Sequence, residues 1–175
     1  YLTQSAEHVE GWTYAKFPYL KKVGWKGHVY GPDSGVYRVG PLGRLNVVEG
    51  MATPLAQAEY ESMYETLGGK PIHSTLAFHW ARLIELLYAT ERALELVKDP
   101  EITSKNVRSE PGKPGEGVGV VEAARGTLIH HYVLDKDALV KDVNMIVATT
   151  NNYPAICMSI RDAAKGLIHG DNVDQ

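Results

Sequence analysis

The chain has 175 residues, 44% hydrophobic and 22% charged, a composition that excludes disordered, collagen-like and coiled-coil proteins. Its net charge of -3 gives no basic excess for nucleic acid, and no apolar run approaches the ~18–20 residues that span a membrane. The single cysteine, Cys157, excludes an intramolecular disulfide and a multi-thiolate metal site built from this chain alone. Because the chain starts at Tyr1 without a signal-like segment, we expect a cytoplasmic protein and a start inside a longer polypeptide.

Residues 1–50 are rich in glycine, proline and aromatic side chains and predict an irregular, loop-rich layer. Pro18, Pro32 and Pro41 interrupt any long helix or strand in this part of the chain. Short pieces such as Gly35–Val39 are the candidates for strands.

Two helices are predicted between residues 53 and 98. The first begins at Thr53-Pro54, an N-cap candidate followed by proline, and ends before Gly68-Gly69. Its apolar residues recur at helical spacing: Ala56, Tyr60, Met63, Tyr64 and Leu67. The second runs from Ser74 to Lys98 and stops at Asp99-Pro100. Its apolar stripe, which Glu91 alone interrupts, contains Leu76, Trp80, Leu83, Ile84, Leu87, Glu91 and Leu94.

A polar loop over 104–119 leads into residues whose hydrophobic period is two, as in strands. The predicted strands are Val118–Ala123, Thr127–Leu134 and Leu139–Val147, with turns at Arg125-Gly126 and at residues 135–137. A last helix is predicted over 154–169. These elements predict a single α+β domain over 1–175, dominated by helices, with a small antiparallel sheet over 117–147.

Most candidate functional residues have an ordinary structural explanation. The glycine clusters match neither a dinucleotide-binding nor a phosphate-binding loop. His130 and His131 are adjacent on a predicted strand, so they point to opposite faces and cannot ligate one metal together. Cys157 is typical of a small buried hydrophobic residue. The charged residues of the second helix, Arg82/Glu85 and Arg92/Glu95, are spaced for surface ion pairs.

Arg125 is less ordinary, because it is followed by glycine at a turn between two strands. Backbone on both sides would aim its guanidinium at an anion or at a metal-bound ligand. The alternative is a turn arginine that pairs with Glu122 or another surface acid.

Four collinear segments resemble one family: YRVGPLGRLN (37–46), HWARLIELLYATERALELV (79–97), EGVGVVEAARGTLIHHY (116–132) and VNMIVATTNNYP (143–154). They are similar to the large, nickel-bearing subunit of [NiFe] hydrogenases, especially the cytoplasmic methanogen-type F420-non-reducing (methyl viologen-reducing) group. The resemblance covers nearly the whole chain and implies a parent enzyme that interconverts H2 with protons and electrons. The implied partner is an iron–sulfur small subunit, and the resemblance allows a further electron-transfer subunit.

The family holds a NiFe(CN)2(CO) centre with four cysteines, in two Cys-x-x-Cys pairs near the ends of the subunit. Neither pair is present here, and Cys157 matches none of the four. The resemblance therefore implies a central fragment that lacks the nickel and iron ligands and is inactive and without cofactor when isolated.

Other residues match positions around that centre. Arg125 matches the arginine that stands over the open nickel–iron position and contacts a cyanide, and Thr149 matches the residue whose hydroxyl donates to the other cyanide. Ala148 occupies the adjacent position, which is proline in many relatives. Met145 matches a residue whose backbone carbonyl helps to hold a magnesium ion. Ala124 departs from the family, which commonly has proline before the arginine.

A second interpretation is a metal-free structural relative, such as the quinone-site subunit of respiratory complex I. That family shares ancestry with the hydrogenase subunit but lacks the nickel ligands. Two flanking Cys-x-x-Cys pairs in the parent reading frame would distinguish the hydrogenase from this relative.

Overall fold

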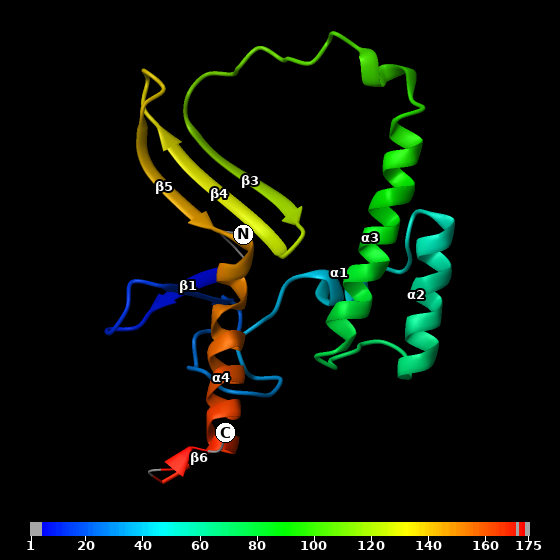
Figure 1. The fold of residues 1–175 in the computed structure, drawn as a ribbon. Helices are drawn as coiled ribbons and strands as arrows, with labels where there is room; N and C mark the ends of the chain where they lie inside the picture. Colours follow the sequence, from blue (N-terminus) through cyan, green and yellow to red (C-terminus); the bar gives the residue numbers. More distant parts are fainter. Residues whose placement is uncertain (1–4, 171, 174–175) are drawn as a thin grey trace. The chain divides into compact units, whose positions relative to one another are not determined.

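The computed structural model describes residues 5–170 and 172–173, which form two compact units. Of the described residues, the sheet unit comprises 5–39, 116–170 and 172–173, and the helical unit comprises 40–115. In the described residues both helices and antiparallel sheets are present, which confirms the α+β class (Figure 1). That the two units form a single domain stays a prediction.

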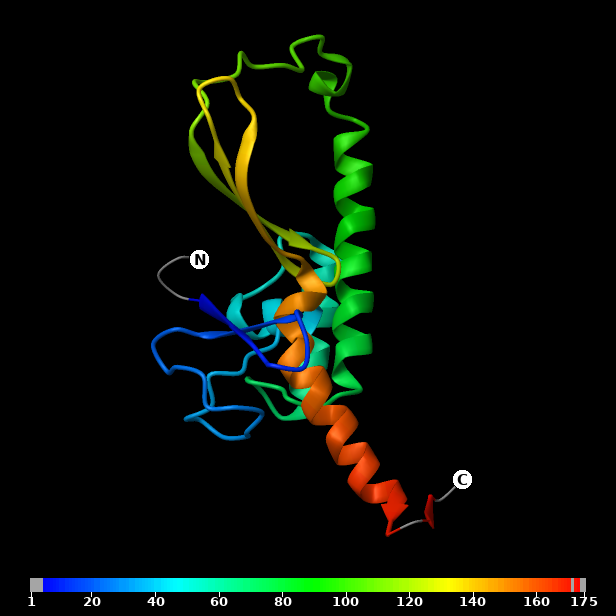
Figure 2. The same cartoon turned by 90° about the vertical axis from the view of Figure 1, so that its left-hand side faces the viewer.

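The sheet unit is built around a three-stranded antiparallel meander in the order β3-β4-β5 (Figure 2). Its larger elements are β3 (Glu116–Ala123), β4 (Gly126–Leu134), β5 (Val140–Ile146), the 3-10 helix η2 (Ala148–Asn152) and α4 (Tyr153–Leu167). A short pair, β6 (Ile168–His169) and β7 (Asn172–Val173), follows α4. The three main strands lie in the range that the alternating hydrophobic pattern predicts.

A β-hairpin that the sequence did not predict precedes this sheet. β1 (Ser5–Val9) pairs with β2 (Lys16–Leu20), so the prediction of irregular structure over residues 1–50 is wrong there. Pro18 lies inside β2 because each strand of a two-stranded sheet is an edge, where a missing N–H breaks no ladder. Aromatic packing accompanies the hairpin: His8 stacks on Trp25 at 4.7 Å between ring centroids. Residues 35–39 form no strand.

The helical unit packs three α-helices and one 3-10 helix from a continuous piece of chain. They are α1 (Pro41–Val47), α2 (Pro54–Leu67), α3 (Ala77–Leu96) and η1 (Pro100–Thr103). Pro41 lies in the first turn of α1, where it starts the helix instead of breaking it. The buried core comprises Leu42, Leu45, Ala56, Tyr60, Met63, Tyr64, Ile72, Ala77, Ala81 and Ile84. Among the described residues no helix is long and apolar enough to cross a membrane.

Helix α3 buries only part of the apolar stripe that the sequence predicts. Ile84 is buried and Trp80 and Leu87 pack against the core, as predicted. Leu76, Leu83 and Leu94 of the same stripe are exposed by 76%, 62% and 57%, and Ala77 and Ala81 are buried in addition. The helix is apolar around most of its circumference, so hydrophobic spacing alone could not give the limits of the buried side. The small side chains of Ala77 and Ala81 allow neighbouring helices to approach closely there.

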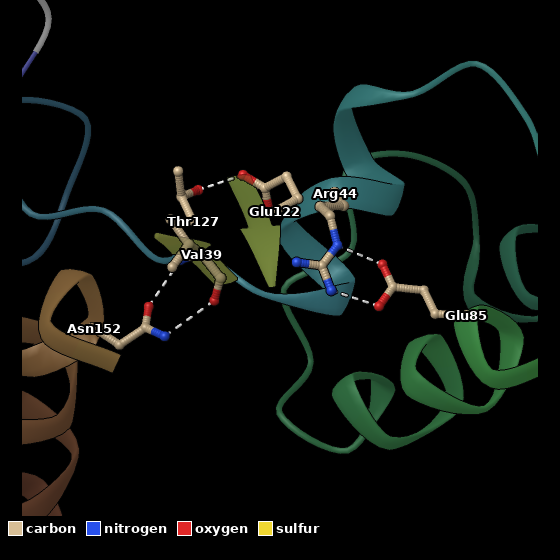
Figure 3. Close-up of polar contacts among 6 residues, drawn as sticks. All are labelled: Val39, Arg44, Glu85, Glu122, Thr127 and Asn152. Atoms are coloured by element: carbon tan, nitrogen blue, oxygen red, sulfur yellow. Dashed lines mark hydrogen bonds and ion pairs between the residues drawn. The ribbon is translucent and has the colours of Figure 1, made fainter. Parts of the chain in front are cut away.

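Two carboxylates of α3 join it to the other helices. Glu85 accepts two hydrogen bonds from the Arg44 guanidinium of α1, at 2.6 and 2.5 Å, a bidentate ion pair in place of the predicted surface pair with Arg82 (Figure 3). The other predicted pair, Arg92 with Glu95, is present. Glu85 therefore contributes to the packing of α3 on α1, whereas Arg92 and Glu95 form a solvent-exposed pair near the end of α3.

Glu91, the polar residue in the apolar stripe, caps the N-terminus of α2. Its carboxylate accepts hydrogen bonds from the Thr53 hydroxyl at 2.6 Å and from the backbone N–H groups of Leu55 at 3.1 Å and Ala56 at 3.0 Å. A helix N-terminus has unpaired N–H groups and favours a negative charge. Desolvation raises the pKa of Glu91, but these hydrogen bonds outweigh it, and the net pKa is lowered.

We expect Ile84→Ala to lower the free energy of unfolding by about 2–5 kcal/mol, because truncating a fully buried side chain leaves a cavity. The adjacent exposed Leu83 is the matched control, and Leu83→Ala should change stability by less than about 0.5 kcal/mol. Urea denaturation of both variants measures the difference. Equal losses would show that the buried side of α3 is assigned wrongly.

Glu91→Gln should lower Tm at neutral pH, because glutamine keeps the shape of the cap but removes its charge and one of its two accepting oxygens. Since the Glu91 pKa is lower in the folded than in the unfolded state, its stabilising contribution is complete above the unfolded pKa and is lost as the pH falls through the folded pKa. The Tm difference between wild type and variant should therefore shrink on acidification. Glu95→Gln, an exposed change on the same helix, is the control that should show little effect.

Candidate functional site

Arg125 lies in the two-residue loop that joins β3 to β4. The strands pair up to Ala123 and Gly126, which leaves Ala124 and Arg125 as the loop, one residue earlier than the predicted turn. Gly126 has a φ of 136°, a conformation that strains any side chain, so glycine suits the start of β4. Arg125 is exposed, and its guanidinium makes no hydrogen bond or ion pair with the described part of the chain.

The register of the sheet brings this loop to the same end as η2. β4 and β5 run antiparallel, and Ile129 pairs with Ile146, so the beginning of β4 lies beside the residues that follow β5. Those residues form η2, where Ala148 is buried and Thr149 is half-buried. Arg125, Ala148 and Thr149 therefore come from segments that meet at one end of the sheet.

A buried amide links the two segments. Asn151, which is 1% exposed, donates a hydrogen bond from its side-chain NH2 to the Thr127 carbonyl at 2.8 Å. Its side-chain oxygen accepts a hydrogen bond from the Tyr37 hydroxyl at 2.6 Å. Both ends of the amide thus have partners, as a buried polar group requires.

The neighbouring amide holds the chain segment that precedes the helical unit. Figure 3 shows the Asn152 side chain against the backbone of Val39: its oxygen accepts from the Val39 N–H at 2.8 Å, and its NH2 donates to the Val39 carbonyl at 3.1 Å. This two-point contact resembles the pairing of one strand with another and fixes an otherwise irregular segment.

The base of the Arg125 loop carries a cross-strand hydrogen bond. Thr127 and Glu122 are paired in the register, and the threonine hydroxyl donates to the Glu122 carboxylate at 2.5 Å (Figure 3). Glu122 lies three residues before Arg125 and Thr127 two residues after it. The loop is therefore closed by a side-chain contact as well as by the strand ladder.

Met145 lies on β5, opposite His130 of β4, near the same end of the sheet. Its side chain is 44% exposed, and its sulfur accepts a weak hydrogen bond from the Tyr132 hydroxyl at 3.8 Å. The Met145 side chain thus packs on the sheet surface, and only its backbone carbonyl remains for the cation role that the resemblance implies.

The other candidates form no site in the described residues. His131 pairs with Glu116 at 2.8 Å, and its register neighbours place His130 on the opposite face, as expected. Cys157 is a half-buried free thiol on α4. No group of three or more His, Cys, Asp or Glu side chains in the described part of the chain is arranged to hold a metal.

These residues do not fit the ligand set of a nickel–iron centre. One cysteine cannot supply four thiolates, and thiolates are the soft ligands that such a centre uses. What the chain offers at this end of the sheet is two donor side chains, the exposed Arg125 guanidinium and the half-buried Thr149 with its hydroxyl.

Sequence reasoning proposed Arg125 and Thr149 as site residues and did not single out Asn151, Asn152 and Thr127, whose contacts the structure shows. The segment ATTNN contains both asparagines, and two adjacent amides after a strand were the available signal. Their partners lie 24 and 113 residues away in the sequence, so no local pattern could connect them.

Comparison with known proteins gives a consistent result. Residues 7–164 match the family model described as nickel-dependent hydrogenase. The chain is 52% identical over 169 residues to the iron-sulfur subunit of an F420-non-reducing hydrogenase from Archaeoglobus profundus, covering 96% of this chain and 35% of that protein. It is 48% identical over 168 residues to a subunit of the vhu F420-non-reducing hydrogenase from Methanococcus voltae, covering 95% of this chain and 38% of the relative.

A solved structure agrees with the fold. An NAD+-reducing [NiFe]-hydrogenase, crystallised in the H2-reduced state, superposes with a TM-score of 0.84 and 39% sequence identity, over 100% of this chain and 37% of the solved chain. The chain thus spans about a third of the length of the relatives that it matches.

The matched residues include the Arg125 hairpin, β5 and η2, and they extend through the helical unit. The resemblance noted from the sequence is therefore confirmed: the chain belongs to the nickel-dependent hydrogenase family, in its large subunit.

Proposed function

We propose that this chain is the central part of a [NiFe] hydrogenase large subunit whose parent enzyme reversibly oxidises H2 to protons and electrons. The names of the relatives support the F420-non-reducing group, and the family match favours a hydrogenase over the complex I relative. The parent would be cytoplasmic and would carry a NiFe(CN)2(CO) centre with a nearby magnesium ion. Its partners would be an iron–sulfur small subunit, together with a further electron-transfer subunit.

The observation that carries the proposal is the placement of Arg125. A charged side chain at the tip of a closed hairpin, without a partner in the described residues, is available to a group supplied from elsewhere. A guanidinium is planar, permanently charged and rich in donors, which suits small anionic ligands such as cyanide. Arg125 would hold these donors and a fixed charge over the centre, and would take part in proton transfer there.

Thr149, Ala148 and Met145 complete the proposal. Thr149 would donate its hydroxyl to a second anionic ligand, and Ala148 would line the position beside it. The Met145 carbonyl would be one ligand of the magnesium ion, which prefers hard oxygen donors. The centre itself, when bound, supplies the redox chemistry, and its thiolates come from outside these residues.

We expect the isolated 175-residue chain to bind no stoichiometric nickel or iron and to show no hydrogenase activity, because one cysteine stands where four thiolates are needed. Elemental analysis of the purified chain measures this directly. The parent enzyme, analysed in parallel, is the positive control. One nickel and one iron per isolated chain would disprove the expectation.

Arg125→Lys in the full-length parent should leave folding and nickel content intact and lower the rate of H2 oxidation by about a hundredfold or more. Lysine keeps the charge but loses the planar fork of donors. Arg161→Lys, a surface arginine of α4 that donates to the His28 carbonyl, is the matched control and should keep normal turnover. Wild-type activity of Arg125→Lys at full nickel loading would refute the catalytic role of Arg125.

A further inference from the structure

We infer that Asn151 is a positioning residue of the proposed site, which ties the Arg125 hairpin to the turn that carries Thr149. The inference rests on the proposed function for the roles of Arg125 and Thr149. It goes beyond that function because it assigns a task to a buried amide that touches neither group directly.

The orientation of the Arg125 side chain depends on the loop that carries it. Its guanidinium has no partner in the described residues, so no side-chain contact within them fixes its direction. Its orientation therefore depends on the backbone of the loop, and hence on whatever holds the start of β4. The ladder of β3 and β4 fixes the loop within the hairpin but does not fix the hairpin against η2.

A hydrogen bond at Thr127 holds the hairpin against η2. The pairing of β4 with β5 is complete only from Ile129 onward, two residues beyond Thr127. At Thr127 itself, the bond from the Asn151 side chain to the Thr127 carbonyl takes the place of a further rung of the ladder. The Thr127 hydroxyl, on the other side of the same residue, closes the hairpin through Glu122. Thr127 is thus a point where the hairpin is bonded directly to η2.

The Asn151 side chain is held in one orientation. The residue is almost completely buried, and its oxygen is occupied by the Tyr37 hydroxyl, so the amide cannot rotate without leaving a polar group unpaired. Asn151 lies two residues after Thr149 in the same 3-10 helix. A fixed Asn151 therefore fixes the position of Thr149 relative to the base of the Arg125 loop. Small displacements of catalytic groups reduce rates strongly, so this relative position matters for turnover.

The test compares Asn151→Asp with Asn152→Asp in the full-length parent enzyme. Each change is isosteric and replaces one NH2 donor by an oxygen, but only Asn151 contacts the hairpin, whereas Asn152 contacts Val39. Hydrogen exchange, followed by mass spectrometry, reports the opening of the peptide over 120–129. We expect exchange there to accelerate about tenfold in Asn151→Asp and to stay at the wild-type rate in Asn152→Asp. Thr127→Val, which removes the hydroxyl contact to Glu122, is a second variant that should also accelerate it.

A double-mutant cycle separates positioning from general destabilisation. If Asn151 acts through Arg125, Asn151→Asp should lower kcat about tenfold or more with Arg125 present and less than about twofold in the Arg125→Lys background. Unchanged exchange of the hairpin in Asn151→Asp would overturn the inference, as would equal losses of kcat in the two backgrounds. Full activity of Arg125→Lys would instead overturn the proposed function, so the two failures appear in different variants.

Discussion

The hydrogen bond between the Asn151 side chain and the Thr127 carbonyl joins the parts of the sheet unit on which the candidate site depends. It adds a direct side-chain contact between the Arg125 hairpin and η2 to the connection that runs through β5. A buried amide suits this task because its donor and acceptor point in fixed, opposite directions and both must be satisfied. The Tyr37 hydroxyl donates to the amide oxygen, so Asn151 also binds the segment that contains Tyr37.

The helical unit uses the same principle with charged groups. Glu91 caps α2 and Glu85 pairs with Arg44 of α1, so two carboxylates of α3 hold the two helices that pack against it. Glu91 satisfies helix N–H groups that would otherwise be unpaired, and Glu85 accepts two parallel hydrogen bonds from the Arg44 guanidinium. Apolar packing gives the unit its core, and these contacts specify how its helices are placed.

The sequence predicted the elements that repeat a pattern. Both long helices and the meander follow from hydrophobic periods of 3.6 and 2, bounded by Pro54, Gly68 and Pro100. The β1–β2 hairpin was missed because aromatic rings from scattered positions pack on it, which gives no period. Helix α1 was missed because its 7 residues, which begin at Pro41, are too few to show a helical period. The buried side of α3 was predicted only in part, at Trp80, Ile84 and Leu87, because leucines surround the helix and the limits of the buried side depend on tertiary contacts.

The residues of the candidate site likewise fall into those that a sequence pattern indicates and those that only tertiary contacts reveal. Arg125 stands out in the sequence because an arginine before a glycine at a strand turn is unusual, and the family motif then identifies it. Asn151 and Asn152 act on backbone groups far away in the chain, and an asparagine that binds distant backbone looks no different in sequence from one in a surface turn. Tertiary polar contacts of this kind require coordinates.

The exposed leucines of α3 have a consequence for the thermodynamics of the chain. Leu76, Leu83, Leu86 and Leu94 already face water in the folded state, so unfolding uncovers less new apolar surface than the composition suggests. Heat-capacity change and denaturant sensitivity both scale with the surface that unfolding exposes. The chain should therefore have a flat stability curve and a shallow urea transition for its length, and both should steepen once those leucines are covered.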